Sequence, residues 1–347
     1  MLPLNPQDRE KVRPRPGPRP PAAESGVGRE PGRPVLSVVT CLFNEEDLVP
    51  ELVRRVTEAC RTLEISFEFL VVNDGSADKT LPSLVSLSLS VPELRIVNLF
   101  RRFGHMPALS AGLSLARGDA VVAMDGDLQD PPELIPRLVR EWQAGAEVVY
   151  GLRTHRKEGA IKRAAIACFH LLLEKISETP IPRQTGTFSL MDRRIVNILC
   201  SMPERHRFLP GLRAWIGGNQ SLIPYDRPDR RHGKSRTGMR GLFSLARTAF
   251  FSFSKVPLRI VSLFSLLCGL VLFLVGITAI AIRLLTDLAI PGWATYTTLL
   301  GVIGFCQSLV MALLSEYVAI IYDEIKLRPL FLVREEFAHG ERIEEIR

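Results

Sequence analysis

The run VLSVVTCL (35–42) is short and rich in β-branched residues, as is typical of a buried strand. A helical stretch follows it to about Leu63, and FEFLVVND (67–74) is the next strand-like run. The same alternation continues beyond this point. Further strands are expected at LRIVNLF (94–100), DAVVAMD (119–125) and AEVVYGL (146–152), with helical stretches between them. Strands that alternate with helices predict an α/β fold with a doubly wound, parallel sheet.

Polar side chains follow three of these expected strands. The segments are Cys41-Leu42-Phe43-Asn44-Glu45, Asn73-Asp74-Gly75-Ser76 and Met124-Asp125-Gly126-Asp127-Leu128-Gln129. Ligands of open α/β sheets bind beyond the carboxyl ends of the strands, so the three segments are expected to converge on one crevice. An aspartate there can accept a hydrogen bond from a nucleobase, and Phe43 can lie against the base. No Gly-x-Gly-x-x-Gly or P-loop pattern occurs, so dinucleotide and P-loop chemistry are unsupported.

The third segment predicts a metal site. Asp125 and Asp127 are two carboxylates one residue apart, and Gln129 adds an amide oxygen. Mg²⁺ and Mn²⁺ prefer oxygen ligands and are often held by one or two carboxylates together with substrate phosphates. The alternative is a simple turn, because Asp-Gly is a common turn dipeptide.

Two uncharged runs predict membrane spans. Residues 260–282 and 294–315 contain no Asp, Glu, Lys or Arg, and the mean hydropathy of the whole chain is +0.14. Each run is long enough to cross a hydrocarbon core of about 30 Å as a helix. The alternative, a buried core helix, is usually shorter. The six cysteines are scattered, which indicates neither a disulfide framework nor a zinc site.

Charge is concentrated next to these runs. Residues 227–259 carry nine Lys/Arg and one Asp, so this segment exceeds the net charge of the whole chain, +7. Its mixture of Phe, Leu and basic residues is typical of an interfacial helix on an anionic membrane, and no nucleic-acid motif occurs. The positive-inside rule then places the N-terminal domain and both termini in the cytoplasm of a multi-pass inner-membrane protein.

The sequence therefore divides into five parts. They are a disordered, basic, Pro-rich leader (1–34), an α/β domain (35–226), a basic loop with juxtamembrane helices (227–257), a two-helix transmembrane hairpin (258–322, with spans at about 260–282 and 294–316), and a cytoplasmic tail (323–347).

Several motifs make residues 35–334 resemble a known family. They are LSVVTCLFNEE (36–46), FLVVNDGSADKT (69–80), RRFGHMPALSAGLSLARGD (101–119), MDGDLQDPPELI (124–135), VVYGLR (148–153), PERHRFLPGLRAW (203–215) and SEYVAIIYDEIKLRPLFLV (315–333). The chain is similar to the family 2 glycosyltransferases of GT-A fold that act on polyisoprenyl phosphates. These include dolichol-phosphate mannose synthases and, more closely, bacterial bactoprenol glucosyltransferases with two C-terminal spans.

The resemblance implies a role for individual residues. Nucleoside contacts fall on Cys41, Phe43, Glu45 and Asp74. The metal and diphosphate fall on Asp125, Gly126, Asp127 and Gln129, and acceptor-phosphate contacts on Arg153 and Arg163. Arg230, Ser235 and Arg236 match a mobile basic loop that closes over the diphosphate. Asp127, Arg153 and Arg163 are the candidate catalytic residues, whereas His105 and His232 are expected to be structural or phosphate contacts.

The implied reaction is inverting and depends on Mg²⁺ or Mn²⁺. One sugar, by preference glucose from UDP-glucose, moves to polyprenyl (undecaprenyl) phosphate at the cytoplasmic membrane face. Mannose or a modified aminosugar is an alternative substrate, and relatives with this hairpin can form homo-tetramers. A processive polysaccharide synthase is disfavoured, because the chain has only Arg213-Ala214-Trp215 in place of a Gln-x-x-Arg-Trp motif.

Some positions depart from the family pattern. Cys41 stands where proline is usual, Asn73 replaces the first aspartate of Asp-Asp-Gly-Ser, and Arg236 replaces a lysine. Close relatives read Gly-Asp-Phe-Arg-Leu where this chain has Thr187 and Ser189. These last two changes leave open a lower activity, an altered acceptor, compensation by a neighbour, or a non-catalytic membrane binding protein.

Overall fold

The computed structural model describes residues 34–153, 185–205, 207–226 and 292–345, together with the single positions 264, 267, 270, 274, 278 and 285. Contacts divide the chain into two compact units. One contains the sheet and the residues after 328, and the other contains the long helix α11 (Trp293–Ile325). The expected leader and most of the basic segment before the first run lie outside the described residues.

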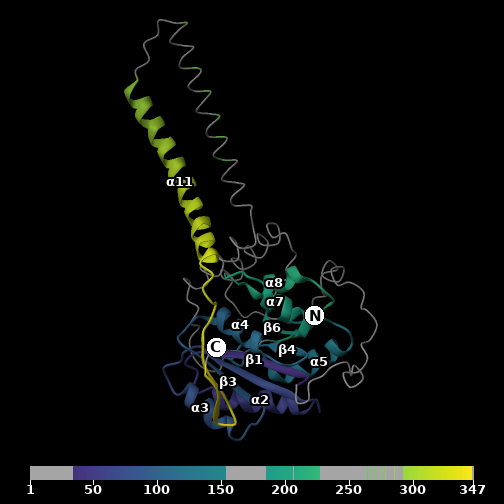
Figure 1. The fold of residues 1–347 in the computed structure, drawn as a ribbon. Helices are drawn as coiled ribbons and strands as arrows, with labels where there is room; N and C mark the ends of the chain where they lie inside the picture. Colours follow the sequence, from purple (N-terminus) through teal and green to yellow (C-terminus); the bar gives the residue numbers. More distant parts are fainter. Residues whose placement is uncertain are drawn as a thin grey trace. The chain divides into compact units, whose positions relative to one another are not determined.

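A nine-stranded mixed sheet forms the centre of the first unit, in the order β7-β5-β6-β4-β1-β2-β3-β8-β9 (Figure 1). The strands are β1 (Leu36–Leu42), β2 (Phe67–Asn73), β3 (Leu94–Leu99), β4 (Ala120–Ala123), β5 (Val148–Arg153), β6 (Thr185–Asp192), β7 (Gln220–Tyr225), β8 (Val333–Ala338) and β9 (Glu341–Glu345). The four strands β4, β1, β2 and β3 are parallel, and β6 and β8 flank them in the antiparallel direction. The expected α/β sheet is therefore confirmed, although it is mixed.

Helices cover both faces of this sheet. They are α2 (Val49–Arg61), α3 (Thr80–Ser88), α4 (His105–Leu115), α5 (Ile135–Gln143), α7 (Arg193–Ser201) and α8 (Leu209–Ile216), with a short 3-10 turn at Pro132–Leu134. The apolar side of α2 packs in one core with Val38, whereas Gly112 of α4 lies against Val39. Successive residues of a strand point to opposite faces, so α2 and α4 lie on opposite sides. This arrangement confirms the doubly wound prediction.

The strand order places a topological switch point between β1 and β4. From β1 the chain proceeds through β2 to β3, and it then returns to the other side of β1 as β4. In open α/β sheets the connections diverge at such a point, and ligands bind in the crevice beyond the carboxyl ends of the strands. The predicted polar segments after β1 and β4 border it.

Two parts of the sheet were not expected. β6 and β7 were not predicted, and β8 and β9 form from residues that the sequence indicated to be a tail. β8 pairs antiparallel with β3, with Asn98 opposite Glu335, and β9 then pairs with β8. The C-terminal segment is therefore part of the central sheet.

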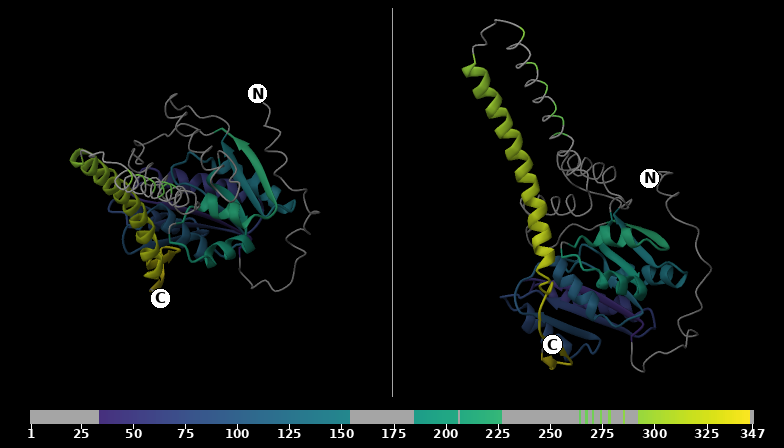
Figure 2. Two further views of the ribbon diagram at one scale, coloured as in Figure 1. Left: turned by 90° about the horizontal axis from the view of Figure 1, so that it is seen from above. Right: turned by 45° about the horizontal axis from the view of Figure 1, so that its top comes forward.

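The second unit is described mainly by α11, a helix of 33 residues that both views of Figure 2 show unbroken. No helix among the described residues meets the combined length and hydropathy of a membrane span. The expected pair of spans is therefore not found there, and most of the first one, 260–282, lies outside the described residues.

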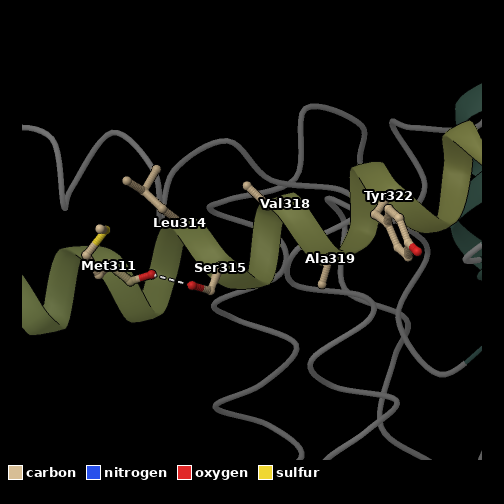
Figure 3. A pocket seen from close by; sticks show the side chains of 6 residues that line it. All are labelled: Met311, Leu314, Ser315, Val318, Ala319 and Tyr322. Carbon is tan, nitrogen blue, oxygen red and sulfur yellow. Dashed lines mark hydrogen bonds between the residues drawn. The ribbon is translucent and has the colours of Figure 1, made fainter.

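A hollow of about 530 Å³ lies along α11 (Figure 3). Its lining is mainly apolar and comprises Met311, Leu314, Ser315, Val318, Ala319 and Tyr322. The Ser315 hydroxyl donates to the Met311 carbonyl at 2.8 Å, as helix residues four apart often do. Among the lining residues that the structure describes, Tyr322 has the only titratable side chain.

Candidate active site

Strand register brings the predicted segments together. Val39 of β1 is opposite Ala123 of β4, so Cys41 and Asp125, two residues further along, lie at the switch point. On the other side of β1, Leu42 is opposite Asn73, and Asp74 follows directly. The backbone N–H of Asp74 donates to the Leu42 carbonyl at 2.9 Å. Three strand ends therefore meet at one edge, as the sequence predicts.

His105 links two of these strand ends. Its Nδ1 lies 3.0 Å from the Cys41 Sγ, and its Nε2 lies 3.3 Å from the Asp125 Oδ1. The electrostatic interaction with Cys41, followed by hydrogen bonds to Asp125 and Cys41, raises the pKa of His105 against the opposing effect of desolvation. The sequence did not predict this bridge. Its signal is a histidine at the first position of the helix after Gly104, which directs the ring at the strand ends.

Asp74 holds the loop that begins α4. One carboxylate oxygen accepts the Phe103 N–H at 2.7 Å, and the other accepts the Gly104 N–H at 2.9 Å. Burial raises the pKa of Asp74, while these two hydrogen bonds and the nearby Arg102 oppose the rise. Gly75 has a φ of +65°, and a Cβ there would lie 2.6 Å from the Arg101 carbonyl carbon, so glycine is required. Asp74 therefore positions the segment that carries His105.

The loop after β1 is joined to the loop after β2. Asn44 adopts a φ of 51°, donates its N–H to Ser76 Oγ at 2.9 Å, and accepts the Ala77 N–H at 2.8 Å. The Glu45 N–H donates to Thr80 Oγ1 at 2.9 Å. These bonds hold Phe43 at the crevice, where the Arg102 guanidinium lies 4.1 Å from the centre of its ring. A flat, cation-backed ring is a suitable surface for a nucleobase.

The Asp125-Gly126-Asp127 turn is pressed against β1. A Cβ on Gly126 would lie 2.3 Å from Leu42 Cδ2 and 3.2 Å from the Cys41 carbonyl oxygen, so a larger residue would require the Leu42 side chain to move. Asp127 Oδ1 accepts the Gln129 N–H at 3.2 Å, and Leu128 has a φ of 58°. The segment is therefore a compact turn that also presents two carboxylates at the crevice.

The donor set at this turn fits a divalent ion that also takes substrate oxygens. The described residues include no cluster of three or more His, Cys, Asp or Glu side chains that would hold a metal alone. Asp125 and Asp127 provide two carboxylates, which is the number that a magnesium-type site commonly uses beside phosphates. Gln129 is held at the turn through its backbone N–H.

A buried guanidinium lies beside Ser189. Arg213 of α8 is fully buried and donates to Ser189 Oγ, to the Thr187 carbonyl at 3.0 Å, and to the Gly186 carbonyl. Its carbon Cζ lies 5.1 Å from the centre of the Tyr150 ring, and burial lowers its pKa. Ser189 is opposite Ala123, so this charge lies one strand from the Asp125 turn. A neighbouring residue thus supplies a guanidinium where the resemblance leads us to expect an arginine at 189.

Comparison with known proteins now fixes the family. The pattern of glycosyl transferase family 2 matches residues 37–199. A prophage SfII-derived bactoprenol glucosyl transferase of Shigella flexneri is 35% identical over 300 residues, which are 86% of this chain and 97% of that relative. The chain belongs to the family 2 glycosyltransferases. The prediction of a glycosyltransferase is therefore confirmed.

Other proteins are also similar to this glycosyltransferase. An uncharacterized glycosyltransferase of Synechocystis sp. is 39% identical over 306 residues, 86% of this chain and 94% of that relative. A glucosyl-3-phosphoglycerate synthase of Mycobacterium tuberculosis, solved with Mn²⁺, UDP-glucose and phosphoglyceric acid, is 19% identical with a TM-score of 0.44. That match covers 64% of this chain and 79% of the solved one.

The remaining predicted site residues of the glycosyltransferase are not described in full. Arg153 ends β5, but only its backbone is described. Arg163, Arg230, Ser235 and Arg236 lie outside the described residues. The assignments of these arginines to acceptor phosphate and diphosphate stay predictions.

Proposed function

We propose that this glycosyltransferase moves one sugar from a nucleotide donor, by preference UDP-glucose, to a polyprenyl phosphate. The observation that carries the proposal is the 35% identity to a bactoprenol glucosyl transferase along 97% of that relative. The geometry supports it, because the Phe43 ring, Asp74 and the Asp125 turn meet at a switch point of the sheet. Nucleotides bind at this place in open α/β sheets.

The reaction needs placement more than a strong base. A phosphate monoester has a second pKa of about 6, so its oxygen is a ready nucleophile at neutral pH. That oxygen forms a bond to the anomeric carbon as the bond to the diphosphate breaks, and the nucleoside diphosphate leaves. Attack from the face opposite the leaving group inverts the anomeric centre. Phe43 with Arg102 would hold the base, and His105 would orient Asp125.

Asp125 and Asp127 are the residues that would hold Mg²⁺ or Mn²⁺, with Gln129 beside them. Such an ion, when bound, neutralises charge that develops on the departing diphosphate. The chain itself contributes a turn that lies close to β1, because Gly126 has no side chain to separate the two. Both carboxylates are thereby offered to the same crevice.

Asp127→Asn tests this function. The variant keeps the size of the side chain and its turn hydrogen bond but removes one negative ligand. Transfer should fall by at least about a hundredfold, because one lost charge-assisted contact costs several kcal/mol in the transition state. The measurement is radiolabelled sugar in a lipid-soluble product, with UDP-glucose compared against other nucleotide sugars and undecaprenyl phosphate as acceptor.

A matched control separates chemistry from folding. Asp47 is an exposed carboxylate, and Asp47→Asn should transfer sugar at the normal rate. Thermal melting of both variants should match that of the unmodified chain. Near-normal transfer by the Asp127→Asn variant would mean that Asp125-Gly126-Asp127 is only a turn, and the proposed site would then be wrong.

We further propose that the chain is anchored in the inner membrane by a hairpin of its two uncharged runs, with both termini in the cytoplasm. The basic segment 227–259 and the exposed apolar side chains along α11, such as Phe305 and Val318, support this proposal. A thiol introduced at Pro291 should react with a reagent added outside intact cells, whereas one at Arg334 should not. The reverse labelling pattern would contradict the topology.

A further inference from the structure

Three polar side chains form a chain of hydrogen bonds across the carboxyl ends of β2 and β3 and the facing part of β8. Asn73 Nδ2 donates to Asn98 Oδ1 at 2.8 Å, and Asn98 Nδ2 donates to Glu335 Oε1 at 2.7 Å. Asn73 and Asn98 are 1% and 5% exposed, so water does not compete for these bonds. We call Asn73, Asn98 and Glu335 the amide relay.

The direction of the relay is fixed by its last member. An ionised carboxylate can only accept hydrogen bonds, so Asn98 must turn its NH₂ group toward Glu335. The Asn98 carbonyl oxygen then faces Asn73, which must donate. An aspartate at 73 would present a second acceptor to that oxygen. The family pattern has an aspartate at position 73, and Glu335, which lies 237 positions beyond Asn98, explains why this chain has an asparagine there.

The relay ends next to the nucleotide site. Asn73 is the last residue of β2, and Asp74 follows it with both carboxylate oxygens bound to the N–H groups of Phe103 and Gly104. His105 comes directly after Gly104 and contacts Cys41 and Asp125. A shift of Asn73 is therefore carried to the loop that holds His105.

A second carboxylate of the same strand makes a useful contrast. Glu336 accepts from Arg95 at 3.1 Å, and Arg95 also donates to Glu68 at 2.7 Å. Arg95 is near the start of β3, whereas Asn98 is near its end. The Glu336 network thus joins β8 to the opposite end of β3, away from the crevice, although both carboxylates join β8 to the sheet.

We propose that Glu335 is a positioning residue for nucleotide binding. Glu335 acts through Asn98 and Asn73 on the loop at the start of α4, which Asp74 holds. The inference rests on the proposed function, because it requires that a nucleotide diphosphate binds at this crevice. It assigns to the C-terminal strand a part in donor binding that is exerted through the relay. Sheet completion and donor affinity are then coupled.

Exchanging the hydrogen-bond donor and acceptor between positions 98 and 335 tests this inference in the full-length chain. Asn98→Asp sets a carboxylate against Glu335, and at about pH 8.5 two carboxylates at hydrogen-bond distance repel unless a proton is retained. Glu335→Gln alone keeps an acceptor for Asn98. In the double variant the introduced glutamine amide donates to the introduced aspartate, which still accepts from Asn73, so all bonds are restored.

The measurements are the dissociation constant of UDP with Mn²⁺, by calorimetry, and the KM values of donor and acceptor. Asn98→Asp should weaken UDP binding and raise the donor KM about tenfold, the factor that one lost hydrogen bond contributes, with the acceptor KM unchanged. Glu335→Gln should stay near the unmodified value. Adding it to Asn98→Asp should return UDP binding to within about twofold of normal.

Glu336→Gln is the control for stability alone. It should lower the melting temperature, because a buried ion pair is broken, and leave UDP affinity unchanged. Equal UDP affinity in the Asn98→Asp variant, or no rescue by Glu335→Gln, would overturn the positioning role while the proposed function stands. An unmodified chain that does not bind UDP would overturn both.

Discussion

Arg213 is the clearest case in which one residue explains the identity of another, here Ser189. A guanidinium retains its proton in a protein, so full burial next to neutral oxygens is costly, and hydrogen bonds from its donors offset part of that cost. Here Ser189 Oγ and the carbonyls of Gly186 and Thr187 accept from the two terminal nitrogens, whereas the buried Nε has no hydrogen-bond partner in the described part of the chain. A second arginine at 189 would meet this charge directly. Serine at 189 and arginine at 213 are therefore a matched pair.

Ser189→Arg should lower the free energy of unfolding by at least about 3 kcal/mol, because it places two guanidinium groups in one buried site. Adding Arg213→Leu should restore most of this loss, since one guanidinium then remains for the carbonyl groups. Chemical denaturation of the single and double variants measures both effects. Additive losses in the double variant would show that the two positions do not share a site.

At the scale of single residues, sequence patterns located most of the crevice. Cys41, Asp74 and Asp125 were predicted to meet because parallel strands end at one edge, and register confirms that they do. The bridging role of His105 was not predicted. Its position depends on the direction in which α4 begins, which Asp74 sets through the Phe103 and Gly104 amides. That contact joins segments about thirty residues apart and leaves no local signal.

At the scale of the elements, the backbone of α4 approaches the sheet closely because Gly112 has no side chain. A Cβ on Gly112 would lie 2.3 Å from Val39 Cγ1 and 3.0 Å from Val72 Cγ2. The glycine therefore lets the helix backbone rest on β1 and β2. Because α4 starts at His105, this close packing also determines how near the His105 imidazole lies to the ends of β1 and β4.

Gly112→Ala should destabilise the chain by about 1–2 kcal/mol, although alanine in a helix is favoured by about 1 kcal/mol, because overpacking costs more. Val39→Ala removes the methyl group in the way. The double variant should be more stable than the sum of the two single changes by about 1 kcal/mol. Melting curves of the three variants decide the matter, and strict additivity would show that Gly112 is replaceable without a clash.

The elements that were predicted and those that were missed differ in pattern. β1 and β2 are mainly apolar and are buried on both faces, which marks them in the sequence. β8 reads VREEFA and β9 reads ERIEE, so charge dominates both. The partner of β8 is β3, which lies far away in the chain and carries Arg95, the partner of Glu336, and β9 then pairs with β8. Hydrophobic periodicity within a short window of sequence cannot reveal a partner strand that lies so far away in the chain.

On the scale of the whole molecule, the sheet is assembled from two distant parts of the chain. β8 covers the outer edge of β3, and Glu336 adds a second carboxylate to Arg95. An uncovered edge strand would present unpaired backbone groups to other molecules. The residues after α11 are therefore structural members of the catalytic unit.

A chain that ends at Leu332 lacks β8 and β9, and we expect it to melt at a lower temperature and to self-associate. The physical reason is the open edge of β3, together with the loss of one carboxylate from the buried Arg95. A chain that ends at Ala338 keeps β8 and should remain close to the full-length chain. Light scattering in detergent and thermal melting compare the two, and identical behaviour would contradict a structural role for β8.

The long separation between β3 and β8 also has a consequence for biosynthesis. Asn98 and Glu335 are 237 residues apart, so at about 5–20 residues per second a ribosome needs roughly 10–50 s to make the second after the first. Throughout that interval the nascent sheet has an open edge and lacks its final strands. The sheet can be completed only when residues 333–345 have been translated and have left the exit tunnel. A nascent chain that stalls before that point would expose the edge of β3 and be a target for chaperones and proteases.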